Sequence, residues 1–158
     1  MKSWQDTKRK RAMANSVKLE IMTPSKRFYS GEVELVIVRT LTGDEGFMAN
    51  HAWATKLLAV GELWIQEAGK KDFRIAAISE GFIDVKESIV IFTDAAEWAE
   101  DINMERALST KATMEDWLIH DEKHNPDEVA IAKINIAKAI TRMNVAEGGA
   151  RRKHLTGR

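Results

Sequence analysis

The spacing of apolar residues changes near residue 95, and this change restricts the fold more than any other feature of the sequence. Before it, apolar and polar residues alternate, as in VKLEIM at residues 17–22. A period of two is typical of a strand with one buried face. After it, apolar residues recur every three to four positions, which is typical of an amphipathic helix. The chain is therefore predicted to be α+β, with strands first and helices last.

Six runs before residue 95 have the strand pattern, and they are rich in β-branched and aromatic residues. Turn signals, mostly glycines, separate them at intervals that are typical of an all-β sandwich or barrel. No helical segment lies between them, so a sheet of parallel strands joined by helices is not expected. The runs are VKLEIM (17–22), GEVELVIVRT (31–40), GELWIQEAG (61–69), DFRIAAIS (72–79), GFIDVKE (81–87) and SIVIFTD (88–94).

Two helices are predicted after residue 95. The first covers about residues 101–118, with Asp101 or Asn103 as N-cap. The polar segment HDEKHNPDE then interrupts the pattern, and Pro126 is suited to the first position of a second helix that ends at Gly148-Gly149. The expected apolar faces are Met104, Ala107, Leu108, Ala112 and Leu118 on the first helix and Val129, Ala132, Ile136, Ala139, Ile140 and Met143 on the second. Two helices with a short connection are expected to form an antiparallel hairpin. Their apolar faces can be buried against each other, against the sandwich or against another protein.

The chain is therefore predicted to have four segments. A basic, flexible extension is expected at residues 1–16, a β-sandwich at 17–96, a helical hairpin at 97–147 and a flexible basic tail at 148–158. The extension contains the run Lys8-Arg9-Lys10-Arg11 but no apolar stretch of the kind found in a secretory signal.

Composition excludes several classes of function. Lysine plus arginine and aspartate plus glutamate each number 24, so no overall charge draws the chain to nucleic acid or to an anionic membrane. The absence of cysteine excludes disulfides, thiolate metal sites and a cysteine nucleophile. No apolar run approaches the roughly 20 residues of a transmembrane helix.

Motifs for catalysis or metal binding are absent from the sequence. His120 and His124 have the spacing of two ligands on a helix, but the glutamate of the zinc-protease motif is missing and the pair lies in a polar break, so no metal site is expected. Asp44 and Glu45 are adjacent, which would point them to opposite faces of a strand. No catalytic residue is therefore predicted. Among five tryptophans, Trp53 in a loop and Trp64 on the polar side of its strand are candidates to cover a partner surface.

Several segments in order resemble the epsilon subunit of F-type ATP synthases, which corresponds to delta in mitochondria. The resemblance begins with Thr23-Pro24, Phe28, Ser30-Gly31 and Glu32-Val33, and continues through Gly46, Phe47, His51-Ala52, Leu57, Gly61, Gly81-Phe82, Val85, Thr93–Glu97 and the segment RMNVAE, covering about residues 17 to 147. It departs where the family more often has Pro-Gly before the histidine and proline after the alanine, since Ala49-Asn50 and Trp53 stand there.

The resemblance implies a non-catalytic rotor subunit of the central stalk, which couples ion flow through the c-ring to rotation and ATP synthesis. It implies contacts with the gamma subunit and the c-ring, for which Thr42, Asp44, Glu45 and His51 are the expected residues. It further implies that the hairpin can reach the catalytic alpha and beta subunits and inhibit ATP hydrolysis. The expected location is the cytoplasmic face of a bacterial cell membrane, as a peripheral protein.

In some bacterial members of this family ATP binds the folded hairpin through an Ile-Asp-x-x-Arg-Ala motif and arginines of the second helix. Here the motif has Asn103 in place of the aspartate, and Lys138 stands where an arginine is expected. Because lysine cannot grip a phosphate with two parallel hydrogen bonds, ATP binding is expected to be weak or absent. The residues that would contact ATP are Glu97, Asn103, Arg106, Lys138 and Arg142, and no other cofactor is expected.

Two alternatives remain open at this stage. One is a β-sandwich binding module whose hairpin docks on a partner unrelated to ATP synthase. The other is a small hydrolase that uses His51 with Asp44.

Overall fold

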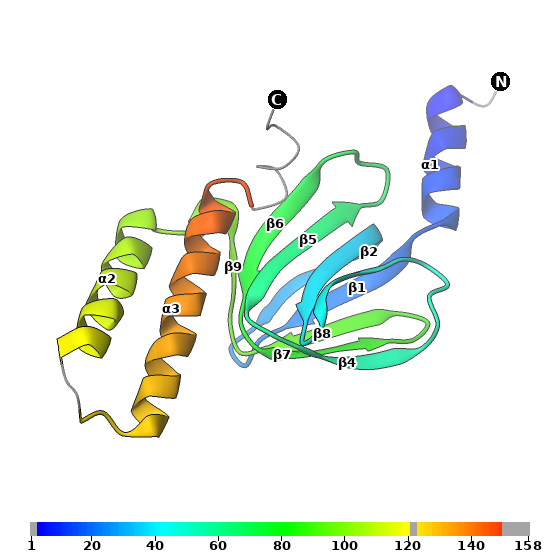
Figure 1. Cartoon of the computed structure of the whole chain (residues 1–158). Coiled ribbons are helices and arrows are strands. Elements are labelled where there is room, and N and C mark those ends of the chain that lie inside the picture. Colours follow the sequence, from blue (N-terminus) through cyan, green and yellow to red (C-terminus); the bar gives the residue numbers. More distant parts are fainter. Residues whose placement is uncertain (1–2, 121–122, 150–158) are drawn as a thin grey trace.

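A computed structural model describes residues 3–120 and 123–149 of the 158-residue chain. It contains nine strands followed by two long helices, with one further helix at the N-terminal side (Figure 1). The α+β prediction, a sandwich followed by a helical hairpin, is confirmed. The strands are β1 (Val17–Met22), β2 (Arg27–Thr40), β3 (Gly43–Phe47), β4 (Ala54–Leu58), β5 (Gly61–Glu67), β6 (Phe73–Ile78), β7 (Gly81–Val85), β8 (Ile89–Thr93) and β9 (Ala96–Trp98). The helices are α1 (Trp4–Ala14), the 3-10 turn η1 (Ala99–Asp101), α2 (Met104–His120) and α3 (Pro126–Ala146).

The strand β2 belongs to both layers of the sandwich. Its first half pairs with β1, from Arg27 to Val33, and its second half pairs with β5 and β3. The strand order is β1-β8-β7-β4-β2-β5-β6-β9, with β3 beside β2. All pairs are antiparallel except β1 with β8. One layer therefore consists of β4, β7, β8 and β1, and the other of β3, β5, β6 and β9, with β2 joining them.

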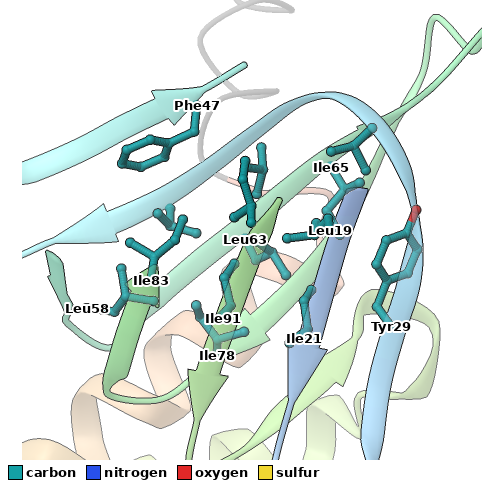
Figure 2. Packing of buried hydrophobic residues seen from close by; sticks show 14 of the residues in the cluster. Leu19, Ile21, Tyr29, Phe47, Leu58, Leu63, Ile65, Ile78, Ile83 and Ile91 are labelled. Atoms are coloured by element: carbon teal, nitrogen blue, oxygen red, sulfur yellow. The ribbon is translucent and has the colours of Figure 1, made fainter. Parts of the chain in front are cut away.

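The core lies between these two layers (Figure 2). Alternation supplies part of this core, because in β1, β7 and β8 every second residue is buried: Leu19 and Ile21 in β1, Ile83 and Val85 in β7, Ile89 and Ile91 in β8. Phe47 is the largest of the fully buried side chains. Burying a side chain of this kind contributes roughly 1.5–3 kcal/mol, so the alternating positions fix which face of each strand points inward.

The sequence did not predict β3 and β4. The strand β3 reads Gly-Asp-Glu-Gly-Phe, a composition with low strand propensity. It forms because it pairs with β2 and because Arg39 pairs with Asp44, and Lys56 with Glu45, both at 2.6 Å. At the C-terminal end of the sandwich domain, β9 continues to Trp98, two residues past the domain boundary expected at residue 96.

Within the basic N-terminal extension, which was expected to be flexible, Trp4–Ala14 form the helix α1. The Ser3 hydroxyl accepts a hydrogen bond from the Gln5 backbone N–H, and Asp6 lies in the first turn with Arg11 in the last. An N-cap with an acidic first turn and a basic last turn stabilises a short helix. Residues 3–11 are solvent-exposed. The expected basic tail at 148–158 lies outside the described residues from 150 onward.

The hairpin begins and ends as predicted. The Asn103 side chain accepts a hydrogen bond from the Arg106 N–H at 2.9 Å, and the Asn125 side chain accepts one from the Asp127 N–H at 3.0 Å. Pro126 occupies the first turn of α3, and Gly148 and Gly149 adopt positive φ after its end. These caps satisfy backbone groups that a helix leaves unpaired.

The predicted packing face of α2 is partly wrong. Ala107 is buried and Met104 and Leu118 are half-buried, but Leu108 and Ala112 are exposed. The buried stripe instead repeats every three to four residues from Met104 through Ala107 to Leu118. Ala107 is small enough to allow close approach of α3, and this sets the rotation of α2 about its axis.

Candidate interaction surfaces

The predicted contact residues lie at both ends of β3. Thr42 is exposed in the turn between β2 and β3, where its hydroxyl lies 3.1 Å from that of Thr40. Asp44 and Glu45 follow at the start of the strand. As expected for neighbours in a strand, they point to different sides, Asp44 to Arg39 of β2 and Glu45 to Lys56 of β4. The structure therefore brings Thr42, Asp44 and Glu45 together at one end of the sandwich.

His51 lies in the loop after the other end of β3 and is not part of that group. Its ring packs edge-on against Phe47 at 4.8 Å, and its Nδ1–H donates to the Ala52 carbonyl at 2.7 Å. Phe47 lies three positions after Asp44 in the strand, which is about 10 Å along the chain. The structure therefore does not bring His51 and Asp44 together as a catalytic pair.

The His51 loop is shaped by an asparagine and carries two exposed apolar residues. Asn50 has φ of 64°, in the left-handed region that favours glycine and tolerates asparagine. This is the position at which the family resemblance expects glycine, so the substitution keeps the backbone conformation. Met48 and Trp53 on either side are 57% and 69% exposed. The loop therefore presents apolar surface beside His51, as expected for Trp53.

An apolar row crosses the outer face of the layer formed by β4, β7, β8 and β1. In the strand register Leu57 pairs with Phe82, Phe82 with Phe92, and Phe92 with Met22. We call these four residues the outer apolar row. Leu57 is 62% exposed, Phe82 39% and Phe92 43%, and the two phenyl rings stack at 4.9 Å. Adjacent aromatic and aliphatic side chains in register form one continuous surface.

Polar residues and a hollow border this row. The next rung of the same face contains Thr55, whose hydroxyl donates to Asp84 at 3.0 Å, and Glu20. A hollow of about 370 Å³ lies between Phe82, Phe92 and Pro24 at the β1–β2 turn. A contiguous exposed apolar patch rimmed by polar groups is typical of a protein–protein interface.

The outer apolar row was not predicted from the sequence, although the strands contain a signal for it. In β7 and β8 a large apolar residue occupies a position that alternation assigns to solvent. Phe82 shares the outward-facing side of β7 with Asp84, and Phe92 shares that of β8 with Val90. One such residue is ordinary. Only the register, which sequence alone did not supply, shows that they are neighbours.

Trp64, the other tryptophan considered for a partner surface, is covered by the chain itself. It is 7% exposed, its indole N–H donates to Glu62 at 2.9 Å, and it packs edge-on against Phe73. A Cβ added at Gly149 would lie 2.5 Å from its ring. The end of the hairpin therefore occupies the surface that Trp64 would otherwise offer.

Two ion pairs hold α3 against the sandwich. The Arg142 guanidinium contacts the Glu97 carboxylate at 2.9 Å, and the Lys138 ammonium contacts Glu80 at 3.5 Å. Glu97, Lys138 and Arg142 border a hollow of about 350 Å³ between α3, β6 and β9. Its other lining residues include Ala77, Ile78 and Ala96. Of the residues expected to contact ATP, Glu97, Lys138 and Arg142 thus lie together. Asn103 and Arg106 are at the start of α2 and are not among the described residues that line the hollow.

Exposed apolar residues are also found on the hairpin. Leu108 and Ile119 are on α2, and Ile131, Ile134 and Ile140 are on α3, with exposures from 39% to 76%. Among the described residues, His124 stacks on Trp117 at 3.5 Å and lies 2.8 Å from its carbonyl through Nε2, while His120 lies 3.0 Å from Asp116. No cluster of three histidine, aspartate or glutamate side chains suited to a metal ion is found among them.

Comparison with known proteins identifies related sequences and folds. The sequence model of the ATP synthase delta/epsilon chain β-sandwich domain matches residues 16–99. The ATP synthase epsilon chain of Alkaliphilus oremlandii is 45% identical over 65% of this chain and 76% of its own length, and that of Desulforamulus reducens is 38% identical over 85% and 100%. A chain of the Euglena gracilis mitochondrial ATP synthase shares the fold with a TM-score of 0.64 and 24% identity, over 81% of this chain and 78% of its own. A chain in a central stalk and c-ring structure of the Tetrahymena thermophila mitochondrial ATP synthase also shares the fold. Its TM-score is 0.60 and its identity 10%, over 82% of this chain and 96% of its own length.

Proposed function

Because the chain belongs to the ATP synthase delta/epsilon family, as an epsilon chain, we propose that it is a non-catalytic subunit of the rotor that joins the gamma subunit to the c-ring. In this role it would pass torque between ion flow through the ring and ATP synthesis. The observation that best supports contact with a large partner is the outer apolar row, with Leu57, Phe82 and Phe92 exposed in one continuous surface.

We assign the outer apolar row and the His51 loop, which leads into β4, to the gamma subunit. Aromatic side chains supply much of the affinity at protein interfaces, and Phe82 and Phe92 stack on each other at the centre of the row. Trp53 adds exposed apolar surface just before β4, with the polar rung at Thr55 between it and Leu57. A partner that covers the row would remove apolar area from water.

We assign the turn between β2 and β3 to the c-ring. It presents Thr42, Asp44 and Glu45 together with Leu41, which is 68% exposed. The two carboxylates are held in place by Arg39 and Lys56, so they offer fixed acceptors for backbone or side-chain donors of a neighbouring loop.

Replacing Phe82 by aspartate tests the gamma assignment. With an affinity-tagged gamma subunit as bait, we expect the Phe82→Asp chain to bind at least about tenfold more weakly than the natural chain, because a charge would be buried at the centre of the contact. Ile131→Asp is the matched control, since Ile131 is also exposed but lies on α3. Equal retention of gamma by both variants, with unchanged circular dichroism, would contradict the assignment.

We further propose that the hairpin regulates hydrolysis of ATP. Contacts with β5, β6 and η1, among them two ion pairs of groups about one-third exposed and the packing of Gly149 on Trp64, attach α3 to the sandwich, and α2 packs mainly on α3. An element with a small docking contact and exposed apolar residues can exchange one partner for another. Its second partner would be the catalytic alpha and beta subunits, which it would inhibit.

ATP binding by this chain is proposed to be weak or absent. Arg142 and Lys138, the cations available for phosphate, are each engaged by a carboxylate of the sandwich. Asn103 uses its side chain to cap α2. Calorimetric titration of the full chain with ATP tests this, and a micromolar dissociation constant would refute it.

The proposed location is the cytoplasmic face of a bacterial membrane, where the chain is held by its partners. Among the described residues no helix has the length and apolar character needed to cross a bilayer.

A further inference from the structure

Cations without ion-pair partners are concentrated on α1. In the described part of the chain, none of Lys8, Arg9, Lys10 and Arg11 contacts a carboxylate, and Lys8 instead lies 3.8 Å from the centre of the Trp4 ring. Many cations elsewhere are paired, as Arg39, Lys56 and Arg142 show. Four adjacent unneutralised charges raise the local electrostatic potential, which a carboxylate-bearing partner would relieve.

A second basic segment meets α1 at a hollow of about 390 Å³. Lys8 and Arg11 line it from α1, and Lys70 and Lys71 line it from the turn between β5 and β6. We call these four residues the basic face. Lys70 also pairs with Glu67, and Glu34 is the carboxylate among the lining residues, which include Asn15, Gln66 and Gly69. Segments about sixty residues apart therefore present cations toward one space, on the side of the sandwich away from the hairpin (Figure 1).

The charge of the rest of the chain restricts the partner. Residues 1–16 contain five basic residues (lysine or arginine) and one acidic residue. Residues 148–158 contain four basic residues and no acidic residue. With 24 of each sign in the whole chain, residues 17–147 hold 15 basic and 23 acidic residues. This acidic body repels a long polyanion such as nucleic acid, while a short acidic segment can contact the basic face alone.

A lipid surface fits the basic face less well than an acidic protein segment does. Membrane-binding helices carry an apolar face opposite their basic one. Among the described side chains of α1, residues 4–11, Trp4 is the only large apolar one. We propose that the basic face is a docking surface for an acidic, carboxylate-rich segment of another protein.

The test uses the full-length chain and a fluorescein-labelled octaglutamate peptide, with binding followed by fluorescence anisotropy. We expect saturable binding at low salt that weakens as salt is added. Reversing three cations, in Lys8→Glu/Arg11→Glu/Lys71→Glu, is expected to weaken binding about tenfold, since three exposed pairs are lost. The charge-neutral variant Lys8→Gln/Arg11→Gln/Lys71→Gln should show a smaller loss and checks the result if the reversed variant unfolds.

A matched control changes the net charge equally at other exposed cations, in Lys26→Glu/Arg27→Glu/Lys133→Glu. We expect this control to weaken binding less than about threefold. The proposal is overturned if octaglutamate does not bind, or if the control loses as much affinity as the basic-face variant. It is also overturned if duplex DNA or phosphatidylglycerol vesicles bind the natural chain more tightly than the peptide does.

Discussion

Arg74 joins three parts of the sandwich through one guanidinium. It lies over the Trp98 ring at 3.8 Å, contacts Glu67 at 3.4 Å and lies 3.9 Å from Glu100 of η1. The same Glu67 accepts a hydrogen bond from the Tyr29 hydroxyl at 3.3 Å. Its pKa is lowered, chiefly by the hydrogen bond from Lys70 and then by Arg74, so its carboxylate stays charged. This network fixes β9 and η1, from which the hairpin starts.

Burial raises the pKa of Tyr29 to about 12, and the nearby Glu67 carboxylate adds to the effect. The folded state therefore holds the phenol proton more tightly than the unfolded state, whose pKa is near 10. The stabilisation this provides is complete below pH 10 and is lost as the pH rises toward 12. Because the chain has one tyrosine, its ultraviolet titration reports this group alone. We expect Glu67→Gln to lower the midpoint more than Glu32→Gln, and equal shifts would contradict the assignment.

Gly81 is required by a close approach of the chain. A Cβ added there would lie 1.8 Å from the Phe92 carbonyl oxygen, and a backbone atom cannot move aside as a side chain can. We expect Gly81→Ala to lower the free energy of unfolding by about 3 kcal/mol, measured by urea denaturation. Gly46→Ala is the control, because its Cβ would meet only side-chain atoms, the nearest being the Leu35 Cδ1 at 3.3 Å, and a change below about 1 kcal/mol is expected. Similar losses in both variants would be inconsistent with this reasoning.

At the scale of the element, α3 determines whether the hairpin stays on the sandwich. It makes the contacts with β5, β6 and η1, whereas α2 packs mainly on α3. The docking ion pairs join groups that are about one-third exposed, so each contributes at most about 1 kcal/mol. The docked position is thus only weakly favoured by charge.

Removing both cations should loosen the hairpin without unfolding it. In Lys138→Ala/Arg142→Ala we expect faster hydrogen exchange in α3 and a change in tryptophan fluorescence as Trp64 loses its cover. Lys133→Ala, an exposed position on the same helix, is the control and should leave both signals unchanged. In the assembled synthase, stronger inhibition of ATP hydrolysis in the double variant would support the regulatory proposal, and unchanged hydrolysis would count against it.

Elements with a clear hydrophobic period could be predicted from the sequence, and those held by pairing could not. The strand β1 was found with its bounds, since Leu19 and Ile21 alternate with charged residues. The strand β3 depends on β2 and on ion pairs to residues distant in the sequence, so no local pattern predicts it. For α2, the apolar pattern fits two rotations, and only contact with α3 selects the one that exposes Leu108.

The candidate sites follow the same rule. The sequence pointed to the β2–β3 turn and to His51 as contact residues, and the structure places them beyond opposite ends of β3. The role of these residues as contacts stays a prediction. The outer apolar row depends on cross-strand register, which one sequence does not contain, whereas the approach of Glu97 to Arg142 was anticipated only through the family resemblance.

At the scale of the whole molecule, the sandwich has a core of its own. That core is assembled from residues of β1 to β8, and none of its members belongs to the hairpin. A chain ending at residue 101 should therefore remain folded. We expect one cooperative thermal transition with a Tm lowered by less than about 10 °C, because contacts of α3 with β5, β6 and η1 are lost but no residue of the core is removed. Circular dichroism melting measures this, and a truncated chain without a transition would show that the hairpin is needed for folding.

The sharing of β2 between both layers has a mechanical consequence. A load applied at the exposed tip beside Leu41 enters a single covalent backbone of fourteen residues, which is hydrogen-bonded on its way to β3, β5 and β1. Sliding of one layer over the other would have to stretch that backbone or break ladders along its length. The sandwich should consequently resist shear as one stiff body, while compliance is left to the hairpin.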